Sequence, residues 1–322
     1  MEQTKILVIG ACGQIGSELT VALRKKYGRD QVIAADIRER NQVGEDNYPY
    51  IKLDVLNKAV LLMLCRDEQI TQVYLLAAML SANGEKEPAV AWQLNMDGLL
   101  NVLDVAVKCG MEKVFWPSSI AVFGPDAPKA LSPQANSSIP STVYGISKAA
   151  GEYWCSYYYE KYGLDVRSLR YPGLISYKSP PGGGTTDYAV DIFHQAIKTG
   201  EYLCFLKPGT ELPMMYIADA VRATMELMEA SVEQISIRTS YNLAAMSFTP
   251  EALGGMIGQY IDGFHLDYMP DFRQRIADSW PDSIDDSQAR EDWGWKPNFG
   301  LEEMVEDMLE HLGRMLWLTK EQ

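Results

Sequence analysis

The feature that most constrains this chain is a glycine-spaced turn near its start. Gly10, Gly13 and Gly16 follow a continuous apolar run at residues 5–9, and apolar residues recur at helical spacing from residue 15. Such a run is typical of a strand buried on both faces. Glycines allow a tight turn and a close backbone approach to a pyrophosphate, whose charge the helix N-terminus stabilises. The pattern predicts a dinucleotide site, with a plain tight turn as the alternative.

Strands and helices alternate through the first half of the chain. We predict further strands at residues 31–35, 50–53, 73–77, 114–116 and 166–171, and helices at 15–26, 58–68, 88–109, 144–162 and 301–318. This alternation implies right-handed crossovers and a parallel sheet with helices on both faces. We therefore predict an α/β fold, a Rossmann-type doubly wound parallel sheet with a smaller C-terminal substrate lobe. The expected division is residues 1–175, to which later segments return, and mainly residues 176–322 for the lobe.

Composition excludes several classes of partner. The 322 residues carry a net charge of −14, which argues against nucleic acid and against an anionic membrane surface. The cysteines are scattered without a CxxC pair, so we expect neither a disulfide framework nor a metal site. We also expect no signal peptide, transit segment or membrane span, and hence a cytoplasmic protein.

An acidic residue ends the second predicted strand, about 20 residues after the glycine turn. The Asp36 carboxylate can accept both ribose hydroxyls and would repel a 2′-phosphate, which favours NAD over NADP. Arg38 leaves NADP open, because an arginine there can accept the 2′-phosphate; we interpret it as flanking the adenine. Asp54 and Val55 end the third strand and can contact the adenine edge, although a turn role remains the alternative.

Tyr144 and Lys148 lie four residues apart in a predicted helix and so face the same way. A free tyrosine titrates near 10, and a nearby cation favours the phenolate, which makes a better base. Ser119 follows another strand at the sheet edge where ligands bind, and its hydroxyl can hold a substrate oxygen. A Tyr–Lys pair alone is common on helices. Together with the glycine turn, this set indicates removal of a proton from an alcohol whose carbon gives up a hydride.

At these residues the chain resembles the extended short-chain dehydrogenase/reductase superfamily over nearly its whole length. The matching positions include the glycine turn, the Leu-Ala-Ala segment ending the fourth strand, and Tyr144 with Lys148. Asn95 and the residues 118–124, 170–173 and 293–297 match as well. Leu75 departs from the pattern, since many relatives have histidine there; we see no catalytic consequence.

Within that superfamily the chain resembles the short-chain type of L-threonine 3-dehydrogenases, most of all at residues 184–189 and also at 117–125, 170–175 and 212–216. The resemblance implies NAD-dependent oxidation of the L-threonine β-hydroxyl to 2-amino-3-ketobutyrate, and a homodimer. Catalysis would rest on Ser119, Tyr144 and Lys148. The expected substrate contacts are Ser81, Ser119, Tyr144, Thr185, Thr186, Asp187 and Trp280. The expected cofactor contacts are Gly10, Gly13, Gln14, Ile15, Gly16, Asp36, Ile37, Arg38, Asp54, Val55, Leu76, Ala77, Ala78, Asn95, Tyr144, Lys148 and Leu174.

Two other functions remain open at this point. A sugar-nucleotide epimerase or dehydratase of the same superfamily would keep NAD bound and return the hydride to its substrate. A non-catalytic NAD(P)-binding regulator is the other alternative, but such proteins often lack the tyrosine or the lysine. Both residues are present here.

Overall fold

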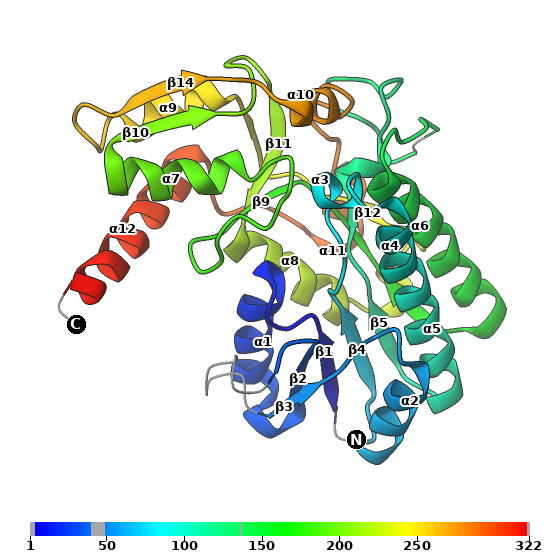
Figure 1. Cartoon of the computed structure of the whole chain (residues 1–322). Helices are drawn as coiled ribbons and strands as arrows, with labels where there is room; N and C mark the ends of the chain where they lie inside the picture. Colours follow the sequence, from blue (N-terminus) through cyan, green and yellow to red (C-terminus); the bar gives the residue numbers. More distant parts are fainter. Residues whose placement is uncertain (1–3, 40–48, 136, 321–322) are drawn as a thin grey trace.

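A parallel sheet forms the centre of the computed structural model, which describes residues 4–39, 49–135 and 137–320 (Figure 1). Within those residues its strand order is β3-β2-β1-β4-β5-β7, and every adjacent pair is parallel. The strands are β1 (Ile6–Ile9), β2 (Val32–Asp36), β3 (Tyr50–Lys52), β4 (Gln72–Leu75), β5 (Lys113–Phe115) and β7 (Asp165–Arg167). This order, with its reversal between β1 and β4, confirms the Rossmann-type prediction.

Both faces of the sheet are covered because its strands bury apolar side chains on both sides, and β1 is apolar at every position. Ile6 and Val8 belong to one buried cluster, and Leu7 and Ile9 belong to a second. Successive side chains of a strand point to opposite faces, so β1 contributes to both clusters. Helices α1 (Gln14–Tyr27) and α8 (Ile217–Glu229) pack together on one face, and α2 (Lys58–Asp67) and α5 (Gly98–Cys109) on the other (Figure 1).

The later part of the chain builds a second group of elements beyond the carboxyl ends of the sheet (Figure 1). Two short sheets, β10-β14 and β13-β11-β9, lie there with the helices α7, α9, α10 and α12, while β12-β8-β6 is a third short sheet. The strands are β6 (Ser118–Ser119), β8 (Leu169–Tyr171), β9 (Gly173–Ile175), β10 (Glu201–Cys204), β11 (Leu212–Tyr216), β12 (Tyr241–Asn242), β13 (Met246–Phe248) and β14 (His265–Tyr268). The helices are α7 (Tyr188–Thr199), α9 (Pro250–Ile257), α10 (Phe272–Ala277), α11 (Ser287–Trp293) and α12 (Leu301–Lys320). The expected division near residue 175 stays a prediction.

Two predicted elements are wrong in detail. The helix expected at residues 88–109 is α4 (Pro88–Trp92) followed by a π-helical stretch, η4 (Gln93–Asp97), and then α5. Such stretches are frequent at functional sites, and η4 carries Asn95. The strand expected at residues 166–171 is two strands, because the chain leaves the central sheet after β7 and joins the β12-β8-β6 sheet as β8.

Among the described residues, no helix is long and apolar enough to cross a membrane.

The turn between β1 and α1 is packed against the end of β4. Gly10 has φ +86°, and a Cβ atom placed on it would lie 2.6 Å from the Ala77 backbone nitrogen. Only glycine fits both the backbone conformation and the space. This close approach brings the start of α1 beside the carboxyl end of β4.

We predict that Gly10→Ala destabilises the protein more than Gly200→Ala does. Gly200 also has a positive φ, +74°, but no atom of the described residues lies within 4 Å of its Cβ position. The control should therefore show only the conformational cost, about 1 to 2 kcal/mol. Gly10→Ala adds a steric clash with the backbone. Urea unfolding of both variants tests this, and equal losses would contradict the close approach.

Candidate active site

Two adjoining hollows lie at the carboxyl edge of the central sheet, near the reversal between β1 and β4. The first is a cavity of about 130 Å³, and the second is a larger cleft of about 1060 Å³. Gln14, Ala78, Leu80 and Asp187 line both. In open α/β sheets this edge is where ligands bind.

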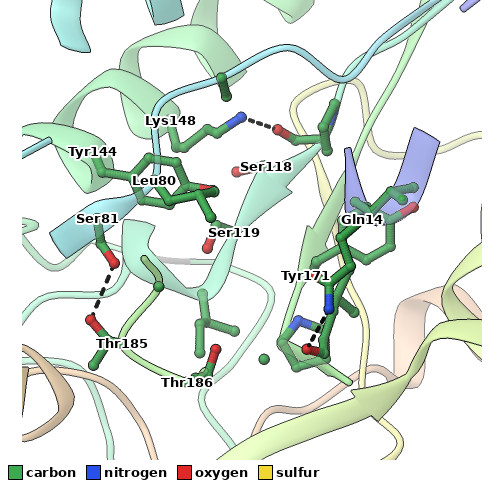
Figure 2. Close-up of a pocket in the computed structure, with 18 of the residues that line it drawn as sticks. Gln14, Leu80, Ser81, Ser118, Ser119, Tyr144, Lys148, Tyr171, Thr185 and Thr186 are labelled. Carbon is green, nitrogen blue, oxygen red and sulfur yellow. Dashed lines mark hydrogen bonds between the residues drawn. The ribbon is translucent and has the colours of Figure 1, made fainter. Parts of the chain in front are cut away.

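The residues predicted for catalysis line the smaller cavity together (Figure 2). Helix α6 (Val143–Tyr162) begins where the Thr142 hydroxyl accepts a hydrogen bond from the Gly145 amide, and it presents Tyr144 and Lys148 from successive turns. Ser119 lies at the end of β6. A Cβ atom on Gly145 would lie 2.1 Å from the Ala121 carbonyl oxygen. That glycine therefore lets α6 approach the segment that follows Ser119.

Lys148 is buried in an apolar setting. Its Nζ atom donates a hydrogen bond to the Pro117 carbonyl at 2.5 Å (Figure 2), and it lies 4.4 Å from the Trp116 ring centre and 5.5 Å from that of Tyr144. Burial lowers the pKa of Lys148 to about 7, because an ammonium loses its hydration there, while Cys155 and Glu152 oppose the shift. The lysine can therefore gain or lose its charge near neutral pH.

Tyr144 departs from the sequence-based expectation of a lowered pKa. Burial raises the pKa of its phenol to about 12, and the hydrogen bond with Ser119 only partly opposes this. The cost of burying a phenolate exceeds the help that its neighbours provide. The expected lowering of the Tyr144 pKa is therefore wrong for the protein without a bound ligand. The phenol needs further positive charge nearby to ionise.

The predicted substrate loop closes one side of the cavity. The Ser81 hydroxyl, at the start of α3 (Ser81–Gly84), lies 3.1 Å from the Thr185 hydroxyl (Figure 2). The Asp187 carboxylate accepts hydrogen bonds from the Gly183 and Gly184 amides, each at 2.8 Å, so it braces the loop. Burial raises the pKa of Asp187, and these amides oppose the rise. Thr186 and the buried Trp280 also line the cavity.

The glycine turn has the shape of a phosphate cradle. Helix α1 begins after Gly13, which as a glycine has no side chain to cap the first amides. A Cβ on Gly16 would lie 2.2 Å from the Gly10 carbonyl oxygen, whereas one on Gly13 would meet only that oxygen, at 3.4 Å. Cys12, Gly13, Gln14 and Arg38 line the larger cleft, so the turn faces open space. Free amides at a helix N-terminus fit a pyrophosphate.

Asp36 ends β2 and ties the glycine turn in place. Its carboxylate accepts hydrogen bonds from the Cys12 amide at 3.0 Å and the Arg38 amide at 3.3 Å. Ile37 beside it is exposed. Ile15, Leu76, Ala78 and Leu174 line the smaller cavity, and Gln14 donates from its side chain to the Leu174 carbonyl at 3.1 Å (Figure 2).

Asp54, Val55 and Asn95 are among the predicted cofactor contacts that line neither hollow. Asp54 accepts a hydrogen bond from the Leu56 amide at 2.9 Å, which is the turn role left open by the sequence. Val55 is buried in the core against Gly98. Asn95 is buried, and its amide bonds to the Met79 backbone and the Ser147 hydroxyl. Direct cofactor contact by these residues stays a prediction, and Asn95 instead links the segment after β4 to α6.

Some cavity residues were not identified from the sequence. Leu80, Ile120, Tyr171 and Pro172 line the cavity, and the Pro117 carbonyl accepts the Lys148 hydrogen bond. A backbone carbonyl carries no side-chain signal, and the apolar residues are indistinguishable from core residues in a sequence. Pro117, Ile120, Tyr171 and Pro172 lie in segments that match the family, and that match was the signal that could have marked them.

Comparisons with known proteins show which family this chain belongs to. A model of the NAD dependent epimerase/dehydratase family matches residues 6–244. The bovine protein named L-threonine 3-dehydrogenase, mitochondrial, is 48% identical over 97% of this chain and 83% of its own length. The solved GalE-like L-threonine dehydrogenase of Cupriavidus necator, in its holo form, is 56% identical over 96% of this chain and 99% of its own, with a TM-score of 0.93. A monomeric L-threonine 3-dehydrogenase from a metagenome is 48% identical over 96% and 99%, with a TM-score of 0.92.

The chain belongs to the NAD dependent epimerase/dehydratase family. The matches confirm the resemblance to L-threonine 3-dehydrogenases, and with it the expectation of an enzyme that uses NAD.

We predict that Lys148→Met stabilises the protein at pH 6 and that this advantage shrinks as pH rises from 7 to 10. In the parent, burial lowers the folded-state pKa of Lys148 to about 7, below the 10.5 of an exposed lysine. The unfolded chain therefore binds more protons in that window, and parent stability rises with pH through it. Methionine cannot titrate, so unfolding free energies of both proteins across pH isolate the Lys148 contribution. A constant difference would contradict the buried, titrating lysine.

Proposed function

We propose that this chain is an NAD-dependent L-threonine 3-dehydrogenase, which oxidises the β-hydroxyl of L-threonine to give 2-amino-3-ketobutyrate. The observation that carries the proposal is that Ser119, Tyr144 and Lys148 line one cavity beside the glycine turn. The names of the bovine and Cupriavidus necator relatives support the substrate.

Each residue of the set has a distinct task in this reaction. Ser119 holds the β-hydroxyl, and Tyr144 takes its proton. Bound NAD⁺ supplies the hydride acceptor and a positive charge. Lys148 sits 5.5 Å from the Tyr144 ring, where its ammonium stabilises the phenolate and can also bind ribose. Because burial holds the pKa of Tyr144 at about 12, the base depends on these cations.

The volume of the cavity favours a small substrate. A volume of about 130 Å³ is below the range of roughly 300 to 1,000 Å³ that drug-sized ligands occupy. An amino acid suits this space better than a sugar nucleotide does. The hydroxyls of Ser81, Thr185 and Thr186, with the Trp280 ring, would contact threonine, and Asp187 holds their loop. Closure over the substrate would exclude water from the hydride path.

We expect absorbance at 340 nm to rise when L-threonine is added to the protein with NAD⁺, and to rise far less with NADP⁺. L-Serine, which lacks the methyl group, and L-allo-threonine, whose β-carbon is inverted, serve as matched substrates.

Tyr144→Phe should lower kcat by at least about 10²-fold, since it removes the general base. NAD⁺ affinity measured by calorimetry should show that the variant still folds and binds.

A Tyr144→Phe variant that keeps wild-type turnover would contradict the assigned base. If no NADH forms with any of these alcohols, the dehydrogenase assignment fails. Purification with tightly bound NAD and turnover of a UDP-sugar would then identify an epimerase. Absence of all turnover with retained NAD binding would identify a regulator.

We also propose that the chain forms a homodimer through an aromatic face on α6. This face comprises the exposed side chains of Tyr153, Trp154, Tyr157 and Tyr162. Trp92 is exposed on α4, which packs against α6. Exposed apolar patches of this kind mark interaction sites. One similar protein is described as monomeric, so the assembly needs a direct test.

The cytoplasmic location stays a prediction, since the bovine relative is named mitochondrial.

We expect Trp154→Glu to shift the protein from dimer to monomer in sedimentation velocity, because it places a charge in the aromatic face. Met63→Glu, at an exposed apolar position on α2, is the matched control and should remain dimeric. A parent protein that sediments as a monomer at all concentrations would contradict the dimer.

A further inference from the structure

A buried ion pair adjoins Ser119, Tyr144 and Lys148 and takes no part in the reaction proposed above. Glu152 and Arg170 are each 5% exposed. Arg170 donates from Nε to one Glu152 carboxylate oxygen at 2.8 Å and from a terminal nitrogen to the other at 2.7 Å. A buried pair of this kind adds little stability, because desolvation offsets the attraction. Its position beside Lys148 suggests another role.

Glu152 is placed to act on Lys148 in two ways. It follows Lys148 by four residues on α6, so the two side chains share a face with Tyr144. It also accepts a hydrogen bond from the Ser118 hydroxyl at 2.5 Å. Ser118 directly follows Pro117, whose carbonyl accepts the Lys148 hydrogen bond. The carboxylate therefore holds the segment that carries both the Lys148 acceptor and Ser119.

The surrounding groups keep this carboxylate in one position. Arg170 also donates to the Gln134 carbonyl at 2.8 Å and to the Asn242 side chain at 3.0 Å, so its guanidinium is anchored on two further segments. Strand β8 pairs Arg170 with Ser118 of β6. Arg170 and Ser118 both donate to Glu152, so two paired strands hold its carboxylate.

We propose that Glu152 is a positioning residue for the Tyr144–Lys148 pair, which keeps Lys148 in its charged form and fixes the Pro117 carbonyl through Ser118. Among the described residues, the titratable groups near Lys148 on α6 are Tyr144, Glu152 and Cys155, and Arg170 of β8 reaches Glu152. Burial of Lys148 opposes its charge, and the carboxylate counters that effect. The proposal deepens the proposed function, because it concerns the same site, but its primary test needs no threonine.

The test is an NMR titration of Lys148 in protein labelled with ¹³C at the lysine ε-carbons, with the signal assigned by its loss in Lys148→Met. We expect Glu152→Gln to lower the Lys148 pKa by about one unit, the lower end of the effect of a nearby opposite charge. Glu160→Gln is the matched control, because Glu160 is exposed on the same helix. An unchanged Lys148 titration in folded Glu152→Gln would overturn the proposal.

Two further variants separate this role from a structural one. Glu152→Gln leaves Arg170 buried without a partner, which can unfold the protein. The double variant Glu152→Gln with Arg170→Gln removes that charge and should still lower the Lys148 pKa, but by less, because the unpartnered arginine cation no longer disfavours the ammonium. Ser118→Ala keeps the ion pair and removes one hydrogen bond, so it should fold. We expect a smaller fall there, and an unchanged value would overturn the link through Ser118.

The kinetic consequence follows from the sign of the shift. Lys148 would lose its proton at lower pH in Glu152→Gln, so the alkaline limb of the kcat profile for threonine should move to lower pH by a similar amount. KM should change less than kcat, and Glu152→Asp should restore part of the alkaline limb. A failed threonine assay would reject the proposed function and leave the NMR titration as a separate result.

Discussion

The close packing of the β1–α1 turn against the end of β4 is the constraint on which the rest of the site depends. Gly10 meets the Ala77 backbone, and Gly16 meets the Gly10 carbonyl, at distances that no Cβ atom could occupy. These contacts place uncapped helix amides beside the carboxyl end of β4. The segment after β4 then lines the same cavity as the start of α1. Any side chain at these positions would separate the two walls of the site.

Burial dominates the electrostatics of the catalytic set. Lys148 and Tyr144 are both shifted toward their neutral forms, with pKa values of about 7 and about 12. Neither group alone is charged readily in such surroundings, since each has lost hydration. The pair becomes useful only when other charges compensate, and the Glu152 carboxylate is the compensating group that the chain itself places nearby. Burial thus makes the reactivity of the pair sensitive to small changes in its neighbours.

Much of the fold was predictable because its signals are local. Apolar strands and helix-spaced residues marked the alternating elements, and the strand order agreed with the prediction. The errors came where tertiary packing overrides local pattern. The π-helical stretch around Asn95 has no distinct sequence pattern, and the segment at residues 166–171 gave no sign that it divides between two sheets. Similarly, Val55 followed a predicted strand end but packs into the core.

The sequence by itself determined the fold class, the cofactor family and the main chemical groups, because glycine spacing and the Tyr–Lys interval act over short distances along the chain. Only the tertiary structure decided how those groups are electrostatically tuned. It brought the Pro117 carbonyl to Lys148 and Arg170 to Glu152, and it buried Tyr144 deeply enough to raise its pKa rather than lower it. The physical reason is that desolvation and charge coupling depend on which segments meet in space, and spacing along one helix does not contain that information.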